Sequence, residues 1–155
     1  MSRGRRETVA DWTMLAAAVL LMASLFLVWS HQLSGVVLDR YANTGAFDGI
    51  PRNPDAWQVY TSADVLLALL SAALMLAALR GGRIFRVVLT VAVAIMLAFV
   101  VHAAGTPPTN GVNVFDSATG HYVDPGAHAG IGVTVALVSL ALAAAGLLLS
   151  FTTDR

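Results

Sequence analysis

The sequence has no cysteine, no lysine and few charged residues of either sign. Without cysteine, the chain cannot form disulfides, thiolate nucleophiles, zinc–thiolate sites or iron–sulfur clusters. Asp, Glu, Lys and Arg make up 12% of its 155 residues, whereas about 25% is typical of a soluble domain. The formal net charge is zero, so the chain lacks the excess basic charge that is typical of nucleic-acid-binding proteins.

Apolar residues instead make up 57% of the chain, and they occur in long runs. A helix that crosses a bilayer needs about 20 mostly apolar residues, and four segments approach or reach this length. We place these spans at about residues 12–30, 54–79, 84–104 and 127–151. The short "RGGR" turn makes the second and third spans antiparallel neighbours. The sequence therefore predicts one all-α domain over residues 1–155, a four-helix antiparallel bundle in the lipid bilayer.

Arginine is distributed unevenly between the two sides of these spans. One side has Arg3, Arg5, Arg6, Arg80, Arg83, Arg86 and Arg155, and the other has Arg40 and Arg52. Because cytoplasmic loops are the ones enriched in basic residues, both termini are expected in the cytoplasm and the two longer loops outside. Exclusive use of arginine, with abundant Ala, Val, Leu and Gly, is typical of a GC-rich bacterial genome. The expected location is thus the bacterial cytoplasmic (inner) membrane.

Two local patterns refine this topology. The first span is expected to be retained, because "FLVWSHQL" offers no small-residue site for signal-peptide cleavage. In the second outer loop, alternating residues flank "DSATG" and then end in turn residues. Such a pattern predicts a small extracellular β-hairpin between Val112 and Val123.

Each span also contains small or polar residues at helical spacing, and such residues mediate helix contacts in lipid. The predicted stripes are Thr13, Ala17, Ser24 and His31 in the first span; Asp64, Ala68, Ser71, Met75 and Ala78 in the second; Thr90, Ala94, Ala98 and His102 in the third; and Gly126, Gly130, Thr134, Ala141 and Ala145 in the fourth. Gly126 and Gly130 form a G-x-x-x-G motif, which favours close helix contact. We interpret it as packing within the bundle rather than as a dimer face.

Asp64 is a carboxylate inside an otherwise apolar segment, and its position depends on where the second helix begins. If Asn53 caps the helix at "NPDAW", the helix runs unbroken to Leu79 and Asp64 lies in the outer leaflet. If "TSAD" begins the helix with Thr61 as the cap, Asp64 is exposed to solvent and has a structural role at the helix start. The cap signals at Asn53 are the stronger ones, which favours the unbroken helix.

Histidine is the natural partner for such a carboxylate. His102 follows Arg86 by 16 residues and Asp64 precedes Arg80 by 16, so the two should lie level. His31 ends the first span and His128 opens the fourth on the same side. Asp64, His102, His31 and His128 therefore form a candidate intramembrane polar site.

Three interpretations of this site are open: a structural hydrogen-bond network, a transition-metal site, and a proton or ion relay. We favour the structural network. Neither a metal nor another cofactor is expected, because no two histidines have the i, i+4 spacing that would make a metal signal specific.

Two segments carry a resemblance to known proteins. "DAWQVYTSADVLLALLSAAL", and "TPP" followed by "GAHAGIGVTVALVSLALAAAG", resemble a set of largely uncharacterised small four-helix membrane proteins that are common in actinobacteria. The resemblance implies a topology and no activity. Claudin-like proteins share the layout, but this chain lacks their W-G-L-W motif and cysteine pair. Small multidrug transporters place a glutamate in the middle of the first helix, where this chain has no acid.

No nucleophile motif or paired-carboxylate spacing is present, so the chain is not expected to be an enzyme. The favoured hypothesis is a non-enzymatic membrane component, an accessory subunit or scaffold. Its outer loops would contact a membrane-protein partner or a second copy of the chain. The alternative is a small transporter or proton- or ion-conducting protein that uses Asp64 and His102.

Overall fold

The computed structural model describes residues 3–31, 52–60, 62–80, 82–107, 114–116, 119–123 and 127–153. This part of the chain is mostly helical, and four of its helices are long and apolar enough to cross a membrane. They are α1 (Arg3–Ser24), α4 (Ala63–Arg80), α5 (Arg83–Gly105) and α6 (Ile131–Thr153). The four helices indicate that the chain is a membrane protein.

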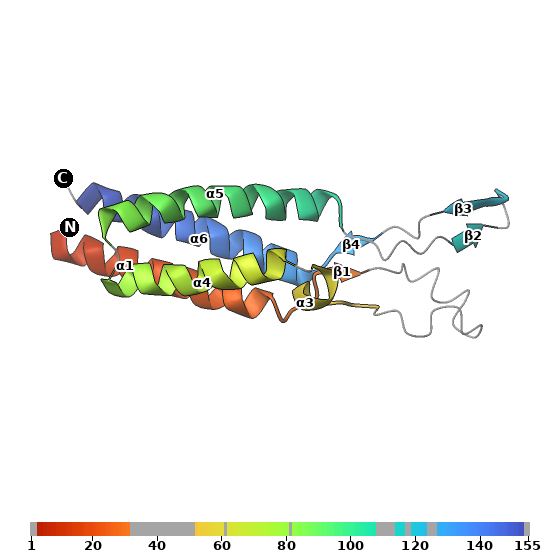
Figure 1. Ribbon diagram of the computed structural model, residues 1–155, viewed down its shortest axis with the longest axis horizontal. Helices are drawn as coiled ribbons and strands as arrows, with labels where there is room; N and C mark the ends of the chain where they lie inside the picture. Colours follow the sequence, from red (N-terminus) through yellow and green to blue (C-terminus); the bar gives the residue numbers. More distant parts are fainter. Residues whose placement is uncertain are drawn as a thin grey trace.

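The long helices lie side by side, with both chain termini at one end, here called the terminal end (Figure 1). The opposite end, the loop end, carries the short elements of the described chain. These are β1 (Ser30–His31), helix α3 (Ala56–Val59), β2 (Val114–Asp116), β3 (His121–Val123) and β4 (His128–Ala129).

All four long helices contribute to one apolar core, which the pattern of α4 illustrates. Buried residues recur every three or four positions along this helix, at Asp64, Leu67, Leu70, Ser71, Leu74 and Ala77. Leu66, Leu69 and Leu76 are exposed, as expected for side chains that face lipid. The predicted stripe on the second span is therefore confirmed at Asp64 and Ser71. Leu70 lies with the buried residues rather than with these three leucines.

A close approach between two long helices involves a glycine that the sequence patterns did not single out. A Cβ on Gly146 of α6 would lie 2.8 Å from Met14 Cγ and 3.2 Å from the Ala10 carbonyl oxygen of α1. Glycine at this position thus lets α1 and α6 pack backbone to backbone, as small residues do in membranes.

The prediction that Gly126 and Gly130 pack two helices is wrong for Gly130. This residue precedes the first residue of α6, so the G-x-x-x-G motif is not helical at that point. Gly126 lies outside the described residues. The predicted stripe on the fourth span is also wrong, since Thr134, Ala141 and Ala145 are exposed.

The stripe predicted on the third span is likewise on the outer side. Ala94, Ala98 and His102 are exposed, whereas the buried face comprises Leu89, Val93, Met96, Val100 and Ala103. The physical reason is that residues 91–101 of α5 are all apolar, so hydrophobic contrast does not identify the inner face along this stretch. The hydroxyl of Thr90, one of the two polar members of this stripe, donates to the Arg86 carbonyl of its own helix at 2.8 Å and needs no partner helix.

Three of the four predicted spans differ from the helices at their loop-end boundaries. The first helix ends at Ser24 rather than near residue 30, and the fourth begins at Ile131 because residues 128–129 form a strand. The unbroken second helix is wrong: α3 is a single turn, and α4 begins at Ala63. The cap of α3 is Asp55, whose Oδ1 accepts the Gln58 N–H at 3.0 Å. The third span, in contrast, agrees with α5 to one residue at each end.

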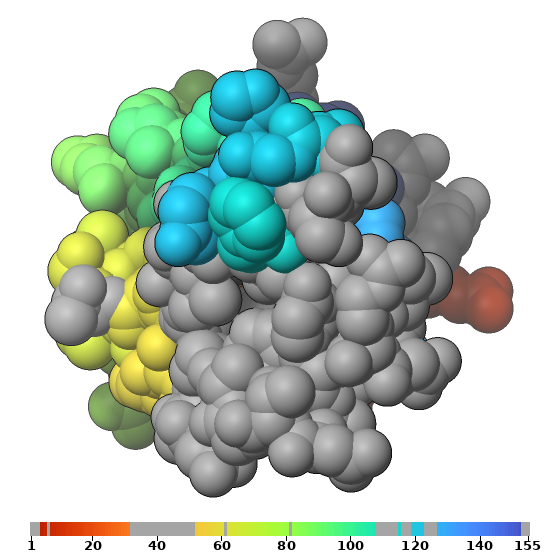
Figure 2. All heavy atoms as spheres, turned by 90° about the vertical axis from the view of Figure 1, so that its right-hand side faces the viewer, coloured from red at the N-terminus to blue at the C-terminus, as the bar shows by residue number. Residues whose placement is uncertain are grey.

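The hairpin predicted in the second outer loop is confirmed for the part that the structure describes. β2 and β3 pair antiparallel, with Phe115 opposite Tyr122 and their ring centroids 5.4 Å apart. Gly120 in the turn has a φ of 69°, a conformation that glycine adopts without strain. Figure 2 looks onto the loop end, where this hairpin, in teal and cyan, is the described element nearest the viewer.

Candidate functional site at the loop end

The chain that leaves α1 lies against the chain that precedes α3. After a turn at Leu25, the Trp29 N–H donates to the Pro54 carbonyl at 2.9 Å, and the Ala56 N–H donates to the Leu25 carbonyl at 3.2 Å. Together these bonds fasten the end of α1 to the start of α3. The buried backbone groups are thereby satisfied at a point where no helix continues.

On its other side, the same segment is bonded to the chain that enters α6. The Gly130 N–H donates to the Trp29 carbonyl at 2.9 Å, and the Gly132 N–H donates to the Val28 carbonyl at 2.7 Å. A Cβ on Gly130 would overlap the Val28 carbonyl group, so this approach requires glycine. We call residues 25–31, 54–56 and 129–132 together the loop-end junction.

An aromatic cluster fills the space beneath this junction. Trp29 is fully buried, and its indole N–H donates to the Ser24 carbonyl at 2.7 Å. The Tyr60 ring packs edge-on against Trp29 at 5.6 Å and against Phe99 of α5 at 5.3 Å. Partial burial raises the pKa of the Tyr60 hydroxyl. The cluster links α1, the segment between α3 and α4, and α5.

Asp64 lies in the first turn of α4 and is 4% exposed. Its Oδ1 accepts the N–H of Val65 at 2.7 Å, and the positive end of the helix dipole favours a carboxylate at this position. The helix thus begins where the "TSAD" alternative placed it, although Asp64 is buried rather than wet. Thr61, the cap in that alternative, lies outside the described residues.

His102 lies on the exposed side of α5, near the end of that helix. Its Nε2 is 3.3 Å from the Thr106 hydroxyl, which also donates to the His102 carbonyl at 2.9 Å. Among the described residues, no hydrogen bond or ion pair joins His102 to Asp64. The predicted pair of Asp64 and His102 is therefore not joined by a hydrogen bond or an ion pair in the described residues.

The other two predicted histidines are brought together. β1 and β4 pair antiparallel, and His31 lies directly opposite His128. Both side chains are exposed. The Nδ1 of His31 is 2.7 Å from Oδ1 of Asn53. Sequence reasoning assigned both histidines to one end of the bundle but not to one strand pair.

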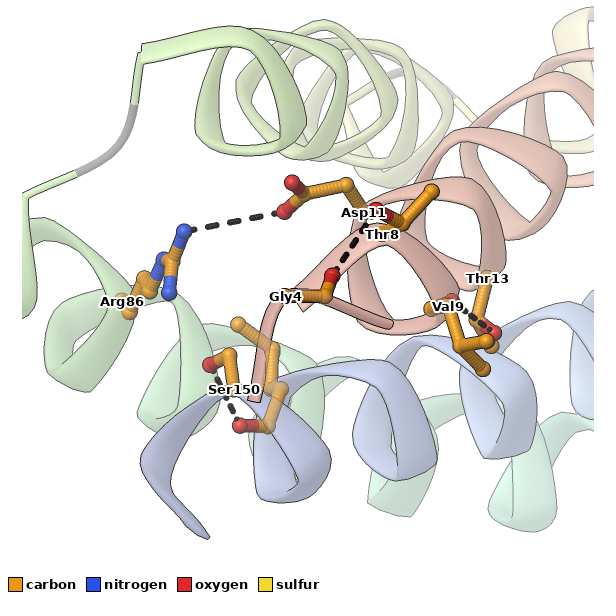
Figure 3. A network of polar contacts seen from close by, with 8 residues as sticks. Gly4, Thr8, Val9, Asp11, Thr13, Arg86 and Ser150 are labelled. Atoms are coloured by element: carbon orange, nitrogen blue, oxygen red, sulfur yellow. Dashed lines mark hydrogen bonds and ion pairs between the residues drawn. The ribbon is translucent and has the colours of Figure 1, made fainter. Parts of the chain in front are cut away.

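The terminal end contains a polar contact that sequence reasoning missed. Nη2 of Arg86 on α5 lies 3.6 Å from Oδ1 of Asp11 on α1, and the Arg86 side chain is 16% exposed. Figure 3 shows Arg86 pointing toward α1 in this region, with Ser150 of α6 nearby. The available signal was that Asp11 and Arg86 both lie at the edge of a predicted apolar span, Asp11 just before the first and Arg86 near the start of the third, where a charge needs a partner.

A groove at the same end has a volume of about 250 Å³. Its lining residues are Thr8, Asp11, Trp12, Leu15, Ala78 and Leu79. Within the ranges that the structure describes, no group of three or more His, Asp or Glu side chains could hold a metal ion. Comparison of the chain with protein-family models, curated proteins and solved structures gave no match.

Proposed function

We propose that this chain is a non-enzymatic integral protein of a bacterial cytoplasmic membrane and acts as an accessory or scaffold component. Its four long helices form an antiparallel transmembrane bundle with the terminal end in the cytoplasm. The loop end faces outward and contacts a membrane-protein partner or a second copy. The position of Arg80, Arg83 and Arg86 at the terminal end supports this orientation.

The observation that carries the proposal is that three of the four ends of the two outer loops lie on one hydrogen-bonded unit. The first loop leaves from His31 in β1 and returns just before Pro54. The second loop returns through β4, whose partner is β1. Loops held on a rigid base are well suited to recognition, because the base fixes where they begin and end.

The buried hydroxyls of the long helices also support this function over a conducting one. Ser24, Ser139 and Ser150 donate to carbonyls of their own helices at 2.7, 2.6 and 2.7 Å. Ser71 donates to the Ala18 carbonyl at 2.7 Å and so links α4 to α1. These groups are satisfied by protein atoms, as expected for packing contacts rather than for a water-lined path.

Quantitative co-purification from the native membrane tests the proposal. The full chain is isolated in mild detergent in three forms: unchanged, Gly130→Ala and Gly105→Ala. Gly130→Ala places a methyl group against Val28, whereas the Gly105 position has open space and serves as the matched control. We expect a stoichiometric partner with the unchanged chain and with Gly105→Ala, and its loss with Gly130→Ala.

Helical circular dichroism and a single gel-filtration peak verify that the Gly130→Ala variant still folds. If no variant retains a partner or self-associates, and Asp64→Asn instead abolishes proton or ion flux in liposomes, the accessory function is wrong. The transporter alternative that uses Asp64 and His102 then replaces it.

A further inference from the structure

We propose that His31 and His128 form a two-histidine site for a divalent transition-metal ion, with Zn²⁺ as the reference ion, at the base of the outer loops. The site does not depend on the proposed accessory function. The two residues are direct partners in the antiparallel β1–β4 pair. Side chains at such positions project from the same face, with Cβ atoms about 4.5–5.5 Å apart. Imidazole nitrogens bind zinc at about 2.0–2.1 Å, so two rings at this spacing can reach one ion.

Asn53 prepares one of the two rings for metal binding. The amide Oδ1 of Asn53 lies 2.7 Å from His31 Nδ1. Because an amide oxygen only accepts hydrogen bonds, Nδ1 must carry the proton. The lone pair of His31 is then on Nε2. Metal-binding histidines in proteins usually have such a second hydrogen bond, which fixes the tautomer and the ring orientation.

The surroundings define the class of ion. Imidazole is a good ligand for zinc, copper and nickel and a poor one for magnesium and calcium. Both rings are exposed, and water or a group from a bound partner can complete the coordination. The described residues do not gather a third histidine or carboxylate at this point. An ion here would join β1 to β4, and therefore the end of α1 to the start of α6.

The test measures thermal unfolding of the full chain in detergent, purified through a tag without histidine. Zn²⁺ is titrated, with Mg²⁺ as the control ion. We expect Zn²⁺ to raise the Tm, EDTA to reverse the shift, and Mg²⁺ to have no effect. The Zn²⁺ shift should disappear in His31→Ala and in His128→Ala but remain in His102→Ala. Asn53→Ala should weaken apparent Zn²⁺ affinity about 10-fold or more.

A second measurement does not depend on stability. One equivalent of Cu²⁺ should give an electron paramagnetic resonance spectrum with coupling to two imidazole nitrogens, and His128→Gln should reduce this to one. Three results would overturn the proposal: no Zn²⁺ shift in the unchanged chain, a shift that persists in both single variants, or a shift lost in His121→Ala instead. The last result would place the ion on the β2–β3 hairpin.

Discussion

The indole of Trp29 lies so close to Gly132 that a Cβ on the glycine would be 2.5 Å from Trp29 Cδ1 and 2.7 Å from Nε1. The start of α6 is therefore packed directly on the Trp29 side chain, which lies in the core at the loop end. Trp29 is fully buried, and its indole N–H is bonded to the Ser24 carbonyl at 2.7 Å. The loop-end junction and the helix packing beneath it consequently depend on each other.

Gly132→Ala should destabilise the chain through overpacking. The added methyl group must displace an indole that is held by its own hydrogen bond, at a cost of about 1–3 kcal/mol. Gly105→Ala, where the new methyl group meets open space, is the control and should leave the Tm nearly unchanged. Thermal unfolding in detergent measures both. Equal Tm values for the two variants would show that the contact between Trp29 and Gly132 is not tight.

Trp29→Phe should lower the Tm as well, for a different reason. The shorter side chain leaves a cavity against Tyr60 and removes the donor to the Ser24 carbonyl. The Ser24 carbonyl still accepts the Leu27 N–H at 3.2 Å, so the lost hydrogen bond itself costs about 0.5–1.5 kcal/mol. Trp12→Phe is the matched control, because Trp12 is 67% exposed on α1. A loss with Trp12→Phe as large as that with Trp29→Phe would contradict this account.

The number of long helices and their order could be predicted from the sequence because each is a long apolar run. The exposed leucines of α4 were also predictable, since Asp64 and Ser71 mark its inner face. The same reasoning failed for α5 and α6. Small residues such as Ala98 and Ala145 are exposed there. These two helices contain too few polar residues to distinguish the buried face from the exposed face.

The loop end was harder to predict because it depends on contacts between distant segments. The Asn53 cap signal indicated a continuous helix, but Asn53 bonds His31 and Asp55 caps a separate turn. His31 and His128 become neighbours only through a strand register between residues 97 positions apart. No local pattern specifies that register, so the sequence predicted a shared end of the bundle and not a shared site.

Asp64 and His102 can be tested for direct coupling by a double-mutant cycle. The structure gives Asp64 a bond to Val65 and gives His102 a bond to Thr106. Asp64→Ala should therefore cost about 1 kcal/mol through loss of the N-terminal acceptor, and His102→Ala should cost little. The two losses in the free energy of unfolding should add within about 0.5 kcal/mol. A larger deviation from additivity would show that Asp64 and His102 interact, as the sequence predicted.

The contact between Arg86 and Asp11 should make a small, salt-dependent contribution to stability. The atoms are 3.6 Å apart, and the Asp11 side chain is 39% exposed, so solvent screens the attraction. Asp11→Asn should lower the free energy of unfolding by about 0–1 kcal/mol, and the loss should shrink as salt is added. Glu7→Gln, at an exposed position one turn earlier in α1, is the control. A loss that does not change with salt would mean that Asp11 acts through packing.

Membrane orientation is tested by reporter fusions at three positions. Both chain termini lie at the end that contains Arg80 and Arg83, and basic residues are retained on the cytoplasmic side. A green fluorescent protein fused after Arg155 should fluoresce, and alkaline phosphatase at the same position should be inactive. Truncated fusions after Arg52 and after Pro107 should behave in the opposite way, because these positions lie at the loop end. Active phosphatase after Arg155 would reverse the proposed orientation and would put the His31–His128 pair on the cytoplasmic side of the membrane.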